Sequence, residues 1–192
     1  MNFLALLALI STLHFTAGVL ETVPLWPLPS SAQLTTDGIS LSVDSTFTFA
    51  YSGQNKIVRG GIDRYIQLIN PSKYIKTRKT VGAIKSCSLF ILDATKIPEI
   101  TGSDESYKIT VEADGVCSLT ANTVWGGLRA LETFTQLLYR DGATDELLLE
   151  GAPLVIADTP RYGHRGILVD SARHYQTVDE IKRIIDSLPA SK

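Results

Sequence analysis

Two runs of alternating apolar and polar residues, 107–112 and 116–120, constrain the fold of this chain more than any other feature. Alternation with a period of two is typical of a strand that buries one face, and the Asp114-Gly115 pair between the runs is typical of a hairpin turn. A helix is predicted next, from about Thr123 to Tyr139, with Gly142 beyond its end. Its apolar stripe consists of Val124, Leu128, Leu131, Thr135 and Leu138. These elements predict an α+β fold, in which an antiparallel sheet carries helices on one face.

The residues before this hairpin predict a second hairpin and a second helix. Residues 39–43 and 46–51 alternate around Asp44-Ser45, which suggests two strands joined by a turn. The helix that follows has its apolar residues on one face and is stopped by Pro71. Those residues are Ile57, Val58, Ile62, Tyr65, Ile66 and Ile69.

Three further segments complete this part of the chain. Proline-rich residues 23–29 are expected to lie extended against the domain and not within a central strand. Residues 73–85 form a basic, polar connection, and residues 87–92 form a short apolar strand. Residues 147–157 supply another apolar stretch, which leads to Asp158.

The pattern changes after Arg161. Residues 166–170 form a continuous apolar run that ends in a carboxylate, as expected for a parallel strand buried on both faces. Residues 177–180 fit a capping box, and Val178, Ile181, Ile184, Ile185 and Leu188 form the apolar stripe of a helix. Strand, loop and helix make one βα unit. A closed barrel of eight units takes about 250 residues, and the 27 residues from Gly166 to Lys192 can hold only the first.

The N-terminal residues predict entry into the secretory pathway. Residues 1–18 contain a short apolar core followed by small residues, as in a signal peptide cleaved after Gly18. The alternative is an N-terminal anchor helix, although the core is far shorter than the roughly 20 residues that span a bilayer. No later segment is apolar enough to cross a membrane, so no stable membrane insertion is expected.

Charge and cysteine content exclude some classes of function. The chain has 18 basic and 20 acidic residues without a charge run, which argues against nucleic acid or anionic lipid as the main partner. Cys87 and Cys117 have no neighbours at metal-ligand spacing, so no metal site is expected. They either form a disulfide, which would fit an oxidising compartment, or remain as two buried free thiols.

Several segments resemble one known family in the family's own order. Residues 158–175, Asp-Thr-Pro-Arg-Tyr-Gly-His-Arg-Gly-Ile-Leu-Val-Asp-Ser-Ala-Arg-His-Tyr, closely resemble the opening of the catalytic barrel in glycoside hydrolase family 20, the β-N-acetylhexosaminidases. Residues 121–136 are similar to the helix before that barrel, residues 105–111 to the preceding strand, and Trp26-Pro-Leu-Pro29 to the mature N-terminal motif. After the signal peptide (1–18), the resemblance implies a non-catalytic α+β domain (19–157) and the first βα unit of an incomplete (β/α)8 barrel (158–192).

The resemblance also implies an activity for the full-length form. Family members remove terminal N-acetylglucosamine or N-acetylgalactosamine from glycans and chitin fragments by substrate-assisted retention, without a metal or organic cofactor. Their catalytic Asp-Glu pair lies in a His-x-Gly-Gly-Asp-Glu motif, which is absent from these 192 residues. No catalytic residue is therefore assigned, and the chain alone is expected to be inactive. The expected location is extracellular or lysosomal, and a dimer with family subunits is possible.

Arg173 is the one residue predicted to bind substrate. It matches the family arginine at the C-terminal end of the first barrel strand, where barrel chemistry gathers, and its guanidinium can donate to sugar hydroxyls. The alternative is a structural pair with Asp170. Direct catalytic roles are not expected for Asp170, Arg165, His164 or His174, and the two histidines are expected to make packing and hydrogen-bond contacts.

Other tempting residues are assigned structural roles. The Asp-Glu pairs at 104–105 and 145–146 are expected to be solvated loop charges, and the pair at 179–180 to cap a helix. Trp26 and Trp125 are expected to pack within the first domain. The competing function is a non-catalytic interaction or glycan-binding module built on the α+β domain.

Overall fold

The computed structural model describes residues 25–70, 82–99 and 102–192, and its first elements form a β-α-β unit. Strand β1 (Ser31–Ala50) pairs in parallel with β2 (Ala83–Asp93), and helix α1 (Lys56–Ile69) lies between them in the chain. A tight turn can join only antiparallel strands. Two parallel neighbours therefore need a longer crossover connection, which α1 provides here. The side chain of Asn55 caps the start of α1 by accepting hydrogen bonds from two backbone N–H groups.

The predicted hairpin at residues 39–51 is wrong, because residues 39–50 belong to the single strand β1. The Asp44 carboxylate accepts a hydrogen bond of 2.9 Å from the backbone N–H of Thr46. This turn does not reverse the chain. It lies where the register of β1 against β2 shifts, between Val43 and Thr48, so the turn residues produce a bulge.

The hairpin predicted around Asp114-Gly115 is confirmed. Strands β3 (Tyr107–Val111) and β4 (Cys117–Thr123) pair antiparallel across it. Gly115 has a φ of +91°, and a Cβ there would lie 2.7 Å from a backbone oxygen, so the turn requires glycine.

The helix predicted next is also present but is shorter than expected. Helix α2 spans Val124–Gln136, and the Thr123 side chain caps its start. The chain then forms the short strand β5 (Leu138–Arg140), which pairs with β6 (Leu147–Asp158). Leu138, predicted to lie on the helix, therefore belongs to the sheet.

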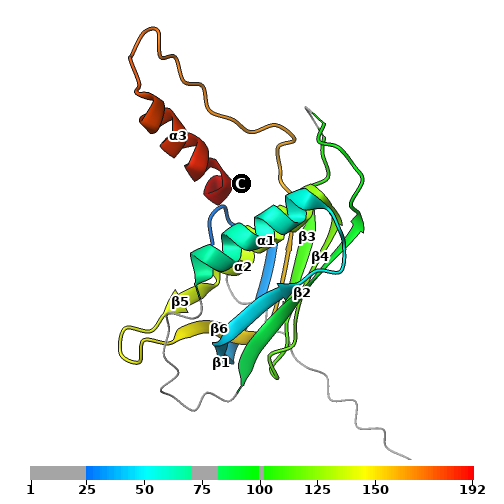
Figure 1. Ribbon diagram of the computed structural model, residues 1–192. Coiled ribbons are helices and arrows are strands. Elements are labelled where there is room, and N and C mark those ends of the chain that lie inside the picture. Colours follow the sequence, from blue (N-terminus) through cyan, green and yellow to red (C-terminus); the bar gives the residue numbers. More distant parts are fainter. Residues whose placement is uncertain (1–24, 71–81, 100–101) are drawn as a thin grey trace, which may run out of the picture.

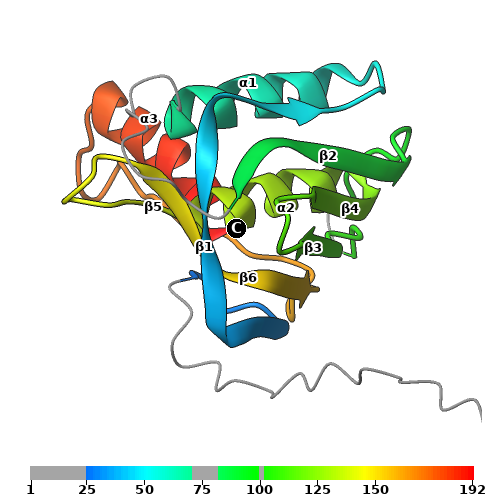
Figure 2. The ribbon, with the colours of Figure 1, turned by 90° about the horizontal axis from the view of Figure 1, so that it is seen from below.

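The α+β class is confirmed, but the sheet is mixed and not purely antiparallel. Its strand order is β1-β2-β4-β3-β6-β5, and β1 also pairs antiparallel with β6. The β1–β2 and β2–β4 pairs are parallel. Both α1 and α2 lie over one face of the sheet (Figures 1 and 2).

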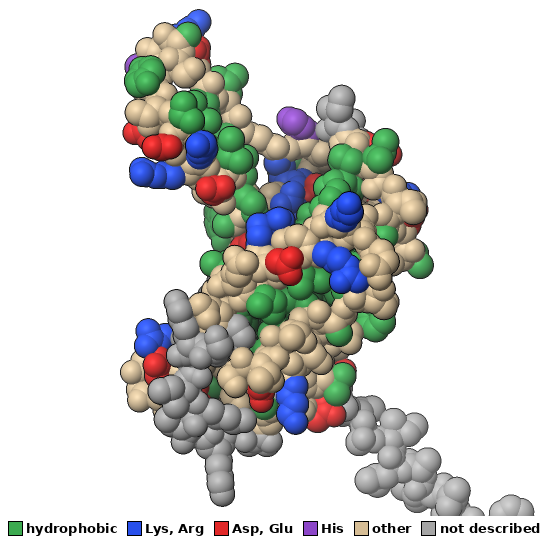
Figure 3. Space-filling model, in the orientation of Figure 1, with side chains coloured by type: hydrophobic (Ala, Val, Ile, Leu, Met, Phe, Trp, Pro, Cys, Tyr) green, Lys and Arg blue, Asp and Glu red, His purple; other side chains and the backbone are tan. Residues whose placement is uncertain are grey.

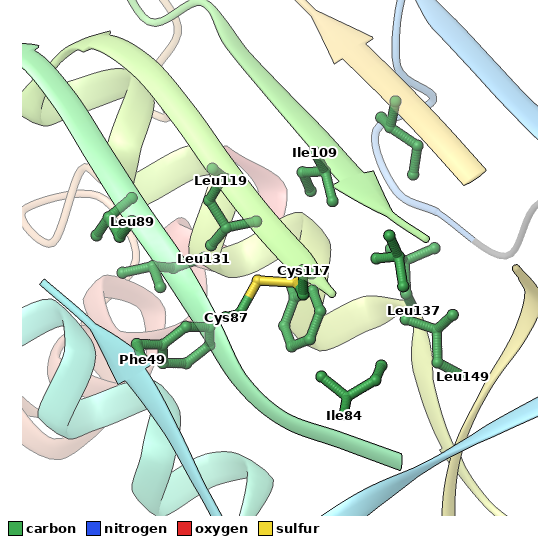
Figure 4. Close-up of a cluster of buried hydrophobic side chains, with 14 of the residues drawn as sticks. Phe49, Ile84, Cys87, Leu89, Ile109, Cys117, Leu119, Leu131, Leu137 and Leu149 are labelled. Carbon is green, nitrogen blue, oxygen red and sulfur yellow. A yellow bond between two sulfur atoms is a disulfide. The ribbon is translucent and has the colours of Figure 1, made fainter. Parts of the chain in front are cut away.

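The core lies between α2 and the covered face of the sheet. Phe134 of α2 is fully buried against Phe47 and Phe49 of β1, with ring centroids 5.7 and 5.6 Å away. Cys87 and Cys117, register partners on β2 and β4, form a disulfide inside this cluster (Figure 4). Of the two alternatives left open by the sequence, the structure contains the bonded one.

The segment after β6 runs away from the sheet domain and returns as a helix (Figure 1). Helix α3 (Val178–Ser187) begins with the predicted capping box between Thr177 and Glu180, and a 3-10 turn (Leu188–Ser191) follows. No residue of α3 is buried. We call residues 166–192 the C-terminal arm.

The strand predicted at residues 166–170 is not formed. Leu168 in its centre is 89% exposed. A strand buried on both faces needs neighbouring strands for its backbone hydrogen bonds, and no described strand lies beside these residues.

Two expectations concern the N-terminal residues and membranes. The predicted signal peptide lies outside the described residues. Leu25 is buried and the backbone of Trp26 is hydrogen-bonded to Gln136 of α2, so the described part of the proline-rich segment lies against the domain as predicted. Among the described residues, no helix is long and apolar enough to span a membrane.

Candidate functional site

A cleft of about 650 Å³ separates the C-terminal arm from the sheet domain. We call it the junction cleft. Its domain side is formed by the loop before β3 and by α2, and its other side by residues 163–167 and the end of the arm. Figure 3 shows a hollow beneath the arm with basic side chains inside it. The cleft thus lies where the two regions of the predicted domain organisation meet.

Glu105 lines this cleft and forms ion pairs with two arginines, Arg129 and Arg165. Its Oε2 accepts a hydrogen bond of 2.5 Å from Nε of Arg129 on α2. Arg165, 60 residues further along the chain, donates from Nη2 to both carboxylate oxygens at 2.8 and 2.7 Å. Only 12% of the Glu105 side chain is exposed, against 26% and 28% for the two arginines. One carboxylate therefore joins the sheet domain to the segment that leads into the arm.

The charge of Glu105 is favoured despite burial. Desolvation would raise the pKa of its carboxyl, but the hydrogen bonds and charges of Arg165 and Arg129 outweigh it, so the pKa lies below its usual value near 4.5. A lowered folded-state pKa gives stability that is present above the unfolded value and lost as pH falls through the folded value. The ion pairs consequently persist in mildly acidic surroundings.

Arg165 makes more contacts than this ion pair. Its Nη1 donates to the backbone oxygen of Tyr162 at 2.5 Å, and its Nε donates to the backbone oxygen of Lys192 at 2.6 Å. The guanidinium presents five N–H donors in a fixed fork, which suits one side chain that binds several acceptors. Arg165 thereby links the first and last residues of the segment 162–192 by hydrogen bonds to their backbone oxygens.

A second polar group lies beside the cleft, around the hydroxyl of Tyr107. This hydroxyl lies 2.6 Å from Oγ1 of Thr133 and donates to Asp158 at 3.1 Å. Lys192 donates to it from Nζ at 3.0 Å. Burial, followed by the Asp158 charge, raises the pKa of Tyr107, and burial lowers the pKa of Lys192. Asp158 also accepts from the backbone of Ser30, so this group links both ends of the sheet domain.

Arg173, the predicted substrate-binding residue, lies outside the junction cleft. Its side chain is 85% exposed, and its Nε lies 3.3 Å from Oδ2 of Asp170. This pair is the structural alternative considered from the sequence. The role of Arg173 toward a sugar stays a prediction.

The other sequence candidates fall in different places. Arg165 forms an ion pair with Glu105, and His164 lines the junction cleft. His164 and His174 are both exposed, so the packing contacts predicted for these two histidines are not formed. Within the described ranges, no group of three or more His, Cys, Asp and Glu side chains could hold a metal ion.

Two expectations about Asp-Glu pairs are wrong. Glu105 is held by two arginines, and Glu146 is only 2% exposed, so neither is a solvated loop charge. Glu180 caps α3 as predicted. Trp125 lines the junction cleft, whereas the Trp26 side chain is exposed and not packed in a core.

No pattern in the sequence predicts the Glu105 site. Its residues lie in a loop, on a helix and after the last strand, and no spacing rule relates residues 24 and 60 positions apart. What the arrangement can do is hold two regions together.

The fold and this junction define a sheet domain with a C-terminal segment that lies across a cleft from it. The sequence profile described as "beta-acetyl hexosaminidase like" matches residues 25–137, and that of the "Glycosyl hydrolase family 20, catalytic domain" matches residues 162–192. The first match covers more than half of the chain. The chain belongs to glycoside hydrolase family 20, the family of the β-N-acetylhexosaminidases.

Individual relatives agree with this assignment. The chain is 35% identical to Beta-hexosaminidase 1 of Arabidopsis thaliana over all of its length and 39% of the relative. It is 33% identical to Beta-hexosaminidase subunit beta of Felis catus, over 98% of the chain and 37% of the relative. The 192 residues thus span less than half the length of these relatives.

Solved structures show the same fold. A chitobiase from Flavobacterium johnsoniae superposes with a TM-score of 0.65 and 25% identity, over 88% of this chain and 26% of that one. The β-N-acetylhexosaminidase of Streptomyces coelicolor gives a TM-score of 0.60 and 22% identity, over 88% of this chain and 33% of that one.

Proposed function

We propose that this chain is the N-terminal part of a β-N-acetylhexosaminidase that removes terminal N-acetylglucosamine or N-acetylgalactosamine from glycans or chitin oligomers. The observation that carries the proposal is the pair of family matches, in the family's order, on either side of the junction cleft. Residues 19–157 form the non-catalytic domain and residues 158–192 begin the catalytic one. Because the His-x-Gly-Gly-Asp-Glu motif is absent from the 192 residues, they do not catalyse alone.

We further propose that the protein enters the secretory pathway and acts outside the cell or in lysosomes. The apolar residues 1–18 support this route. The buried Cys87–Cys117 disulfide also supports it, because disulfides form and persist mainly in oxidising compartments. Some relatives are named as subunits, which makes another family subunit a reasonable partner.

Arg173 is proposed to bind hydroxyls of the terminal sugar in the complete enzyme. The test is a chimera in which residues 1–192 continue into the matching remainder of the Arabidopsis relative. We expect this chimera to release 4-nitrophenol from 4-nitrophenyl N-acetyl-β-D-glucosaminide. An Arg173→Met change in it should reduce kcat/KM about 10- to 100-fold, since hydrogen bonds to a charged group are worth about 1.5–3 kcal/mol.

The control for this prediction is Arg161→Met, because Arg161 is also exposed and lies in the same segment but matches no sugar-binding position. It should leave kcat/KM unchanged. A folded, secreted chimera without activity would count against the proposed function, and an Arg173 variant as active as the parent would remove the assignment of this residue.

A further inference from the structure

The two regions of the chain are joined by one carboxylate held between two guanidinium groups. Arg129 approaches Glu105 from α2 of the sheet domain, and Arg165 approaches it from the start of the catalytic-domain match. Arg165 is the last residue before the apolar run of residues 166–170. Whatever fixes Arg165 therefore fixes the point from which the chain runs toward Arg173.

We propose that Glu105 is a positioning residue, which through Arg129 and Arg165 clamps the start of the catalytic domain onto the sheet domain. The inference rests on the proposed function, since it takes Arg173 as the residue being positioned. Glu105 lies 61 residues or more from every part of the arm in sequence, and its ion-pair partners are Arg129 and Arg165, whereas Arg173 pairs with Asp170. Its effect on the sugar site is thus exerted through Arg165.

The geometry favours a clamp over an incidental surface ion pair. Exposed ion pairs contribute little because water screens them and long side chains lose freedom. Here the carboxylate is mostly buried and accepts three hydrogen bonds, and Nη2 of Arg165 contacts both of its oxygens. Arg165 also donates to the backbone of Tyr162, so its own side chain is fixed at the segment that it anchors.

Removal of either side of the pair leaves the other charge in a partly buried cleft. Such a loss is costly where the partner remains desolvated. No residue of α3 is buried, and among the described residues the arm's other hydrogen bonds to the sheet domain involve its last residues, with Gln136 donating to Ala190 and Lys192 donating to Tyr107. The cost should therefore appear as local opening of the junction and not as unfolding of the core.

Trp125 offers a direct probe of that opening. It lines the junction cleft, four residues before Arg129 and hence on nearly the same face of α2. The chain has two tryptophans, so a Trp26→Phe background leaves Trp125 as the only indole. In the 192-residue chain carrying this background, acrylamide quenching of Trp125 then reports access to the cleft.

The experiment compares Glu105→Gln, Arg165→Met and their combination with the Arg161→Met control. We expect both single variants to increase acrylamide quenching of Trp125. The expected size of the effect is a rise of about tenfold in the open fraction of the junction, which corresponds to about 1.4 kcal/mol of local opening. The double variant should match the single ones, because the pair acts as a unit. Arg165→Lys should be intermediate, since one ammonium can contact Glu105 but cannot also reach the backbone oxygens of Tyr162 and Lys192 as the three guanidinium nitrogens do.

Two results would overturn the clamp. One is acrylamide quenching of Trp125 in Glu105→Gln and Arg165→Met that equals the quenching in Arg161→Met. The other is faster amide hydrogen exchange throughout β3 and β4, because a global effect would make Glu105 a general stability residue. Neither readout requires hydrolysis, so the clamp can fail while the active chimera upholds the proposed function, and the reverse also holds.

Discussion

Phe134→Ala is expected to lower the free energy of unfolding by about 3–5 kcal/mol, the range for deleting a buried phenylalanine side chain. Phe134 is fully buried on α2, and its ring contacts those of Phe47 and Phe49. The loss combines transfer free energy with a cavity between the helix and β1. Because domains of this size have about 5–15 kcal/mol in total, the variant should be marginal at best. Urea denaturation followed by circular dichroism measures the change.

Phe90→Ala is the matched control for this prediction. Phe90 lies on β2 and is 58% exposed, on the sheet face that no helix covers. Its replacement should change stability by about 0.5 kcal/mol or less, as for surface positions in general. If the two variants lost similar stability, the core would not lie between α2 and β1.

Removal of the disulfide is expected to have the next largest effect. Cys87 and Cys117 are both buried and are 30 residues apart in sequence. A crosslink that closes a loop of this length stabilises the native state by about 3–4 kcal/mol in the chain-entropy description. The Cys87→Ala/Cys117→Ala double variant should lose about that much, measured by thermal or urea unfolding without reductant.

The control uses the reductant itself. Unfolding of the parent in dithiothreitol should approach that of the double variant, whereas the double variant should not respond to the reductant. A parent protein whose unfolding is insensitive to the reductant at every denaturant concentration would show that the two thiols are not bonded. That result would also withdraw the disulfide as support for a secretory route.

Local signals in the sequence were informative where the neighbours in space are neighbours in the chain. The Asp114-Gly115 turn needs only the backbone conformation of its own residues, and the capping box at Thr177 needs only Glu180 three positions later. Both were predicted correctly. The family resemblance also came from continuous segments, above all residues 158–175.

Features that depend on distant partners were missed for a physical reason. Asp44 makes the same turn contact in a bulge as in a hairpin, and only the long pairing of β1 with both β2 and β6 distinguishes them. The parallel strand expected at residues 166–170 requires neighbouring strands for its hydrogen bonds. Glu105 is read as a solvated charge until Arg165 is brought to it by the fold. In each case the deciding group lies elsewhere in the chain.

Residues 1–192 contain the matches to both family profiles but lack the His-x-Gly-Gly-Asp-Glu motif. The most direct test is to express this chain in a secreting host and purify it. The folded protein is then assayed with 4-nitrophenyl N-acetyl-β-D-glucosaminide beside the chimera that carries a complete catalytic domain. We predict hydrolysis by the chimera and none by the 192-residue chain above a mock purification. Turnover that co-purifies with the 192-residue chain would contradict the claim, because it would require a catalytic pair other than the Asp-Glu pair of the family motif.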